Sequence, residues 1–347
     1  MDCAIVGPQP SGWRDQVTAL IGRRELIALL GGATAAWPLG ARAQIDKVAK
    51  LGILAVAREA PRTKPAYEAF FAELQALGFK EGTNLTSETH WIDEDTRGPL
   101  TVAAEIAQSA VDVLVIEGAE SVLKAAMAAN PNLPIVVYAN NYDPIERGYA
   151  KTLSQPGGNV TGVFTRQPEL AEKQLELLTQ ASPTAVRLAM LWNSESVDQF
   201  NAAQRRATLL GLTVTAVELQ KLPDDLDAAF RTISDNRAQM LHVLSSPLFF
   251  PYRLQISQFA IRNRLPSMFI FRSYAEAGGL MSYGADRIAG AKLLGSYVAK
   301  ILKGIKPGDL PLDQPTKYEF TVNLKTANAI GIEIPTAILL RADEVIE

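Results

Sequence analysis

Cysteine and histidine are nearly absent from this sequence. Its 347 residues contain one cysteine, Cys3, and two histidines, His90 and His242. Three such residues, far apart in the chain, cannot form a structural disulfide or a Cys/His zinc site. Both histidines also lie within strand-like apolar runs, so we expect buried core residues. Cysteine-based hydrolases, His-based catalytic triads and metal enzymes are therefore poor interpretations of this chain.

A strong charge of either sign is missing as well. The chain has 34 Lys and Arg against 37 Asp and Glu, for a formal net charge of -3 at pH 7. This balance argues against a nucleic acid or an anionic membrane as a partner held by bulk charge. No apolar run reaches the roughly 20 residues of a membrane-spanning helix. Hydrophobic residues nevertheless make up 48%, which is enough for globular cores, and the length favours two lobes.

The N-terminal residues have the pattern of an export signal. Arg23 and Arg24 precede a short apolar stretch, Leu26 to Leu39, and an Ala-x-Ala site follows at Ala41-Arg42-Ala43. This combination predicts a twin-arginine signal peptide over residues 1–43, cleaved after Ala43. A buried N-terminal helix is the less favoured alternative. We expect the mature protein in the periplasm, where a chain without cysteine suits the oxidising conditions.

Strand-like and helix-like segments alternate through the mature chain. An apolar run at 47–56 is followed by apolar residues at helical spacing up to Gly78, and residues 111–116 are apolar without alternation apart from Asp112, as in a parallel strand covered on both faces. A second series, from 186–192 to a helix ending at Gly211, repeats the spacing of the first. The pattern predicts an α/β protein with two Rossmann-like lobes, each built on a parallel sheet.

The repeat sets the expected division of the chain. Lobe I should hold residues 46–165 and 284–325, and lobe II residues 166–283 and 326–347. Ligands of open parallel sheets bind beyond the carboxyl ends of the strands. The candidate ligand-binding residues at those ends are Ala57, Arg58, Glu117, Gly118, Ser121, Asn140, Tyr142, Asp143, Trp192, Asn193, Ser245, Ser246, Arg272 and Tyr283. Such amides, aromatics and hydroxyls suit the orientation of a small polar or zwitterionic molecule better than bond cleavage.

Several candidates also have purely structural interpretations. Asp143 before Pro144 has the pattern of a helix N-cap, and Trp192 ends an apolar strand and could belong to the core. Arg58 and Arg272 could pair with a ligand carboxylate or remain solvated surface charges. Glu117 either meets a ligand ammonium or caps local amides. The sequence leaves these alternatives open.

Six segments of the mature chain stand out as motifs: Asp143-Pro144, the run from Gln155 to Gly162, Pro247 to Phe250, Ala277 to Gly284, and the tail segments Gln314 to Phe320 and Ala342 to Ile346. Together they resemble the motifs of the ABC-transporter substrate-binding proteins of the tryptophan/tyrosine-type uptake family. Two differences from many relatives stand out. Ala119-Glu120 replaces a small hydroxyl residue and proline, and Ser246 stands where an acidic residue is common.

The resemblance implies a type I periplasmic binding-protein fold, with two lobes joined by a hinge and closing on one small ligand. It also implies delivery of that ligand to an ABC transporter permease, but it does not fix the ligand, which we expect to be an amino acid, aromatic or organic acid. We expect no catalysis, cofactor or metal, and a monomer. Two other function classes compete: a secreted hydrolase using the same cleft, and the ligand-sensing part of a receptor or regulator, because such proteins share this fold.

Overall fold

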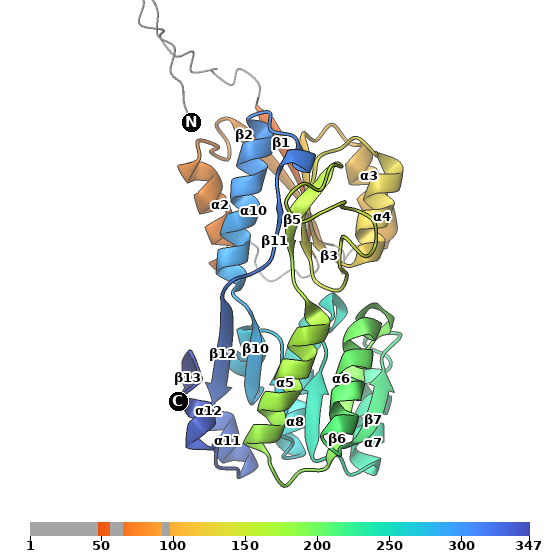
Figure 1. The fold of residues 1–347 in the computed structure, drawn as a ribbon, viewed down its shortest axis with the longest axis vertical. Coiled ribbons are helices and arrows are strands. Elements are labelled where there is room, and N and C mark those ends of the chain that lie inside the picture. Colours follow the sequence, from red (N-terminus) through yellow and green to blue (C-terminus); the bar gives the residue numbers. More distant parts are fainter. Residues whose placement is uncertain (1–47, 56–64, 92–97) are drawn as a thin grey trace, which may run out of the picture. The chain divides into compact units, whose positions relative to one another are not determined.

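A computed structural model describes residues 48–55, 65–91 and 98–347 (Figure 1). The predicted signal peptide at 1–43 and two candidate ligand residues, Ala57 and Arg58, lie outside this range. Residues 47–347 form one unit by their internal contacts. Within the described residues, no helix combines the length and apolar character needed to cross a membrane.

The first sheet is parallel throughout, with strand order β11-β5-β4-β3-β1-β2. Its strands are β1 (Ala49–Ala55), β2 (Leu85–Trp91), β3 (Val113–Gly118), β4 (Ile135–Ala139), β5 (Val160–Phe164) and β11 (Leu312–Asp313). Alternate strand residues bury on opposite faces, so both faces need helices. One face packs on α2 (Pro65–Ala76) and α10 (Arg287–Leu302), and the other on α3 (Pro99–Gln108) and α4 (Glu120–Ala129).

The second sheet has strand order β13-β12-β10-β9-β8-β6-β7 and is parallel except between β10 and β12. Its strands are β6 (Arg187–Trp192), β7 (Thr213–Glu218), β8 (Met240–Val243), β9 (Ser267–Phe269), β10 (Met281–Ala285), β12 (Tyr318–Asn323) and β13 (Glu344–Ile346). Helices again cover both faces. They are α5 (Gln167–Ala181), α6 (Val197–Leu209), α11 (Leu324–Ile330) and α12 (Thr336–Leu339) on one, and α7 (Leu226–Asp235), α8 (Arg253–Arg262) and α9 (Arg272–Glu276) on the other.

The chain passes between the two sheets three times, after β5, after β10 and after β11 (Figure 1). We call residues 48–164 and 287–313 the first lobe, and residues 167–285 and 318–346 the second lobe. The expected boundary at residue 325 needs correction, because β12 belongs to the second sheet. Phe320 of β12 pairs with Tyr283 of β10 and buries in the core of that lobe. The third crossing therefore occupies residues 314–317.

The two histidines differ in environment. His242 on β8 is fully buried, and its Nε2–H donates to Oε1 of Gln174 at 2.9 Å. Burial lowers the pKa of His242 to about 3, so this ring is neutral. His90 on β2 is only partly buried and lies 2.7 Å from a carboxylate oxygen of Glu88. The expectation of two core histidines thus holds for His242 and fails for His90, because β2 is an edge strand.

Candidate functional site

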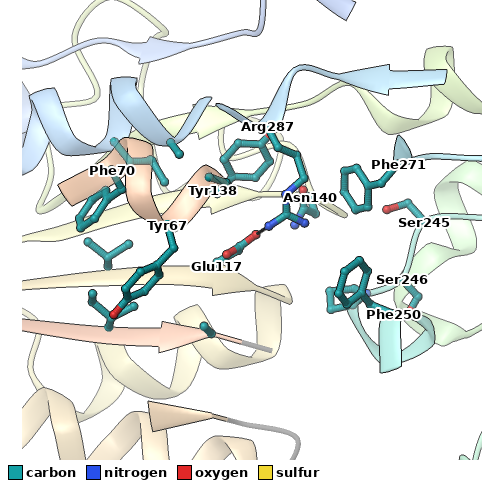
Figure 2. A pocket seen from close by; sticks show the side chains of 17 residues that line it. Tyr67, Phe70, Glu117, Tyr138, Asn140, Ser245, Ser246, Phe250, Phe271 and Arg287 are labelled. Atoms are coloured by element: carbon teal, nitrogen blue, oxygen red, sulfur yellow. Dashed lines mark hydrogen bonds and ion pairs between the residues drawn. The ribbon is translucent and has the colours of Figure 1, made fainter. Parts of the chain in front are cut away.

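A cavity, here called the aromatic pocket, is lined by residues of both lobes (Figure 2). The first lobe supplies the ends of β1, β3 and β4 together with α2 and α10. The second lobe supplies the segments that follow β8 and β9, including the 3-10 helix η3 (Pro247–Tyr252). The lining residues are Ile53, Ala55, Ala66, Tyr67, Phe70, Val115, Glu117, Tyr138, Asn140, Ser245, Ser246, Pro247, Phe250, Phe271, Arg287, Ala291 and Leu294.

Aromatic rings form two opposite sides of this pocket. Figure 2 shows Tyr67, Phe70 and Tyr138 on one side of its charged centre and Phe250 and Phe271 on the other. Two of these rings also contact residues outside the pocket lining. The hydroxyl of Tyr67 forms a hydrogen bond with the hydroxyl of Thr89 at 2.9 Å, and Phe250 packs edge-on against Tyr274. A planar apolar group can therefore lie between rings whose positions are already fixed.

The charged centre of the pocket is an ion pair between Glu117 and Arg287. Glu117 lies near the end of β3, and Arg287 is the first residue of α10, whose N-cap Asp286 accepts from two backbone N–H groups. The Arg287 guanidinium also lies 4.8 Å from the ring centroid of Phe271, in the second lobe. The side chains of Arg287 and Glu117 are 34% and 33% exposed, respectively. A ligand can therefore reach both charges, whose sum is zero.

Two buried polar atoms in the pocket lack a hydrogen-bond partner within the described residues. They are the hydroxyl of Tyr138 and Oδ1 of Asn140, on residues that are 5% and 6% exposed. Burial raises the pKa of Tyr138 to about 12, so it remains a neutral hydroxyl. A buried polar group left without a partner costs about 1–3 kcal/mol. Both atoms are therefore natural contacts for polar groups of a ligand.

The serines of the pocket are fixed by residues behind them. The backbone N–H of Ser245 donates to Oε1 of Gln199 at 2.9 Å. Oγ of Ser246 accepts from Nδ2 of Asn193 at 3.0 Å and from the backbone N–H of Leu248 at 3.2 Å, which caps η3. Ser246 therefore positions the helical turn that carries Phe250, and Asn193 supports the pocket without lining it.

Comparisons with known proteins identify the family of this chain. The model of the family of ABC transporter substrate binding proteins matches residues 51–346. The chain belongs to this family. Among curated proteins it is similar to a tyrosine-binding protein of Clostridioides difficile (strain R20291), with 23% identity over 278 residues and 79% of each chain covered.

Solved structures show the same fold for this substrate-binding protein. A crystal structure of an ABC domain in complex with L-Trp from Streptococcus pneumoniae superposes with a TM-score of 0.76 at 23% identity, over 86% of this chain and 99% of that one. A leucine binding protein, LivK, from Thermotoga maritima gives a TM-score of 0.52 at 15% identity, over 74% and 81%. The fold is that of a type I periplasmic binding protein.

The structure brings only part of the predicted set together in this substrate-binding protein. Glu117, Asn140, Ser245 and Ser246 line the aromatic pocket. Tyr142 and Asp143 line a different cavity, here called the acidic cavity, which is bordered by α5, α6 and the turn after β4. Its lining residues are Asn141, Tyr142, Asp143, Glu146, Phe164, Thr165, Arg166, Gln167, Pro168, Glu169, Glu172, Glu195, Asp198, Gln199, Ala202 and Arg205.

Asp143 and Tyr142 of the acidic cavity make contacts that stabilise the first lobe. Oδ1 of Asp143 accepts from the backbone N–H groups of Ile145 at 2.7 Å and Glu146 at 3.3 Å, so Asp143 stabilises the turn after β4. Tyr142 is buried in the first-lobe core and packs edge-on against Tyr149. Neither residue is among those that line the aromatic pocket, although Asn140, two residues before Tyr142, does line it.

The remaining described candidates lie outside the aromatic pocket. Trp192 stacks on Phe200 at 4.4 Å and Tyr283 on Tyr318 at 5.9 Å, each at the second-lobe core. Arg272 pairs with Glu276 at 2.8 Å and with Glu344 of β13. Gly118 is buried at the end of β3, and Ser121 is exposed on α4. Strand alternation explains the two aromatics, because neighbouring strand residues face opposite sides of a sheet.

Sequence reasoning missed most of the aromatic wall and the arginine at its centre. Tyr67 and Phe70 come from α2, Arg287 begins α10, and Tyr138 lies within β4. Candidates chosen only because they follow strands do not include residues on the helices that cover the same edge of the sheet. Asp286 was the available signal for Arg287, since an N-cap directly after an apolar strand places the first helical residue beside the carboxyl end of the sheet.

Proposed function

We propose that this protein is the solute-binding component of an ABC importer, and that it captures one aromatic amino acid in the aromatic pocket for delivery to a membrane permease. The observation that carries the proposal is the pairing of aromatic sides with a neutral Glu117–Arg287 centre. An aromatic amino acid has the matching composition, a planar apolar group on a zwitterionic backbone. Its net charge of zero matches the summed charge of that centre.

Each part of such a ligand has a partner of the right chemistry. Arg287 offers N–H donors to the carboxylate, and Glu117 offers acceptors to the ammonium. The partnerless Oδ1 of Asn140 can accept a further ligand N–H, and the ring fits beside Tyr67, Phe250 or Phe271. Ring contacts of this kind contribute about 0.5–1.5 kcal/mol beyond area burial. The tyrosine-binding relative and the L-Trp complex support the same ligand class.

Transport follows from the division of the pocket between two lobes. A ligand gains its full set of contacts only while Phe250 and Phe271 lie against the first-lobe residues. Ligand therefore favours the arrangement in which the lobes are together, by as much as its contacts with both exceed its contacts with one. The three crossings after β5, β10 and β11 are the hinge in this proposal, and the permease distinguishes the two arrangements.

Export and the absence of catalysis complete the proposal. Arg23 and Arg24 direct the precursor to the periplasm, and the mature monomer starts after Ala43. Replacing both arginines with lysine should retain precursor in the cytoplasm. A secreted hydrolase is less well supported, because no histidine accompanies Ser245 and Ser246 in the lining, and His242 is bonded to Gln174. Among the described residues, no group of three or more His, Cys, Asp or Glu is placed to hold a metal.

The test is calorimetric titration of the purified protein with L-tryptophan, L-tyrosine and L-phenylalanine. L-Leucine and L-glutamate serve as controls that lack, respectively, the ring and the net charge of zero. We expect one-site binding of at least one aromatic amino acid and recovery of that ligand unchanged by mass spectrometry. Binding of L-glutamate alone, or conversion of the ligand, would contradict the proposal.

A further inference from the structure

Gln199 of α6 contacts the aromatic pocket and the first lobe at the same time. Its Oε1 accepts from the backbone N–H of Ser245 at 2.9 Å, and its Nε2 donates to the carbonyl of Ser245 at 3.1 Å. The same Nε2 donates to Oδ1 of Asn141 at 3.1 Å, across the boundary between the lobes. Gln199 and Ser245 are buried, at 2% and 4% exposure.

The donor and acceptor count of the amide explains why this contact is directional. A glutamine side chain has one oxygen and two N–H donors. The double contact with Ser245 uses the oxygen and one N–H, and it fixes the plane of the amide within the second lobe. The second N–H of Gln199 is left for the first lobe, so Asn141 must present its oxygen rather than its NH₂ group.

Both ends of this chain of hydrogen bonds connect to the aromatic pocket. Ser245 lines it from the second lobe, and Asn141 directly follows Asn140, which lines it from the first. We propose that Gln199 is a positioning residue that locks the lobes together and thereby sets the residence time of the ligand. We call Asn141, Gln199 and Ser245 the amide latch. The proposal rests on the proposed capture of a ligand between the lobes.

The latch differs from the other contacts between the lobes on this side. Arg147 of the first lobe and Asp198 of the second form an ion pair at 3.1 Å, but their side chains are 42% and 51% exposed. Water and salt weaken such a pair, whereas the bond from Gln199 to Asn141 is partly buried, joins two uncharged groups and is not screened by salt. The latch is therefore expected to resist opening more than the ion pair beside it.

The direct test is Asn141→Ala, which removes the first-lobe acceptor and leaves the contact of Gln199 with Ser245 intact. Dissociation of L-tryptophan, followed by stopped-flow fluorescence, should become about 3- to 10-fold faster, which corresponds to one neutral hydrogen bond. Association should stay within twofold. Asn130→Ala is the matched control, because Asn130 is also half-buried and donates to Ala107 wholly within the first lobe. It should leave dissociation unchanged.

A ligand-free measurement separates the latch from the identity of the ligand. Spin labels on exposed residues of the two lobes, at Gln108→Cys in α3 and Ala228→Cys in α7, report the distance between them once Cys3 is replaced by serine. Asn141→Ala should shift or broaden the distance distribution relative to the labelled parent, and Asn130→Ala should not. An unchanged distribution overturns the latch, even if L-tryptophan binds. A changed distribution supports it, even if L-tryptophan does not bind.

A double-mutant cycle adds a test of the route through Gln199. Gln199→Met removes all three hydrogen bonds at nearly constant side-chain volume. Because the contact of Asn141 runs through Gln199, the double variant with Asn141→Ala should shift the label distance no more than Gln199→Met alone. Additive shifts would mean that Asn141 acts on the lobes independently of Gln199, and would overturn the proposed chain of contacts.

Discussion

Two cavities lie on either side of the consecutive residues Asn140 and Asn141, and their chemistry is opposite. Asn140 lines the aromatic pocket, where Glu117 is the one carboxylate among the described lining residues and is paired with Arg287. Asn141 lines the acidic cavity, where the carboxylates are Asp143, Glu146, Glu169, Glu172, Glu195 and Asp198, against the two guanidinium groups Arg166 and Arg205. A hollow in the surface is therefore not sufficient to identify the site.

The two cavities also differ in the groups that their carboxylates contact. In the acidic cavity, Asp143 stabilises its own turn, Asp198 pairs with Arg147 and Glu169 pairs with Arg166. Three of these six carboxylates therefore already have a structural partner. Both cavities hold buried polar atoms without a partner within the described residues: the Tyr138 hydroxyl and Oδ1 of Asn140 in the aromatic pocket, and Nδ2 of Asn141, the Tyr142 hydroxyl and Oε2 of Glu195 in the acidic cavity. The aromatic pocket differs because rings form two of its sides and its carboxylate, Glu117, is paired with Arg287, a combination that suits an aromatic zwitterion.

The largest expected contrast is between Arg287→Met and Asp143→Asn. Loss of Arg287 removes the carboxylate partner and leaves Glu117 unpaired, so aromatic amino acid binding should weaken by about 10- to 150-fold, as for one charge-assisted hydrogen bond. Asparagine still caps the turn at 143, so that variant should bind like the parent. Calorimetric titration of both variants measures the contrast, and weaker binding by Asp143→Asn alone would assign the ligand to the acidic cavity.

Replacing one aromatic ring of the pocket should weaken ligand binding less than replacing Arg287. Phe271→Leu keeps an apolar side chain but removes the ring that faces Arg287, so affinity should fall by about 2- to 12-fold. Phe230→Leu is the matched control, because Phe230 stacks on Phe259 in the second-lobe core, 4.1 Å between ring centroids, and lines neither cavity. It should lower the melting temperature without changing affinity. Equal losses of affinity would show that lobe stability, not ring contact, limits binding.

Much of the architecture follows from the sequence, while the site follows only in part. Continuous apolar stretches such as 113–116 predict a parallel sheet covered on both faces, and β3 has that environment. The pocket depends instead on which helices reach the sheet edge. Tyr67 and Phe70 look like ordinary core residues of an amphipathic helix until α10 is known to pack beside α2. Similarly, β12 pairs with β10 across 33 or more residues, a contact that local patterns do not encode.

The acidic cavity should affect the pH dependence of protein stability and not the affinity for ligand. Burial raises the pKa of Glu195, whose Oε2 has no partner within the described residues. The folded state therefore holds a proton more tightly than the unfolded state, so the charged form destabilises folding above the raised pKa. This penalty disappears as pH falls below the unfolded value of 4.5.

Glu195→Gln should consequently be more stable than the parent at pH 7, by about 1 kcal/mol or a rise of roughly 2–4 °C in melting temperature. The difference should shrink toward pH 4. Thermal unfolding at pH 7, 5.5 and 4 measures it. A gain that is the same at all three values would trace to packing instead of charge, and ligand affinity at pH 7 should not change.

The smallest effect is expected at the exposed ion pair between Arg147 and Asp198, which borders the acidic cavity and spans the two lobes. Exposed pairs contribute about 0.2–1 kcal/mol, because water screens the charges and ordering two long side chains costs entropy. Asp198→Asn should therefore speed ligand dissociation by about 1.4- to 5-fold in low salt and by nothing measurable in 1 M NaCl, where the screening length is about 3 Å. Asn141→Ala should keep its effect in high salt, because the amide latch contains no formal charge.

Stopped-flow dissociation at both salt concentrations compares the two variants directly. A loss for Asp198→Asn that equals or exceeds the loss for Asn141→Ala at 1 M NaCl would mean that the rim of the acidic cavity, and not the amide latch, holds the lobes together.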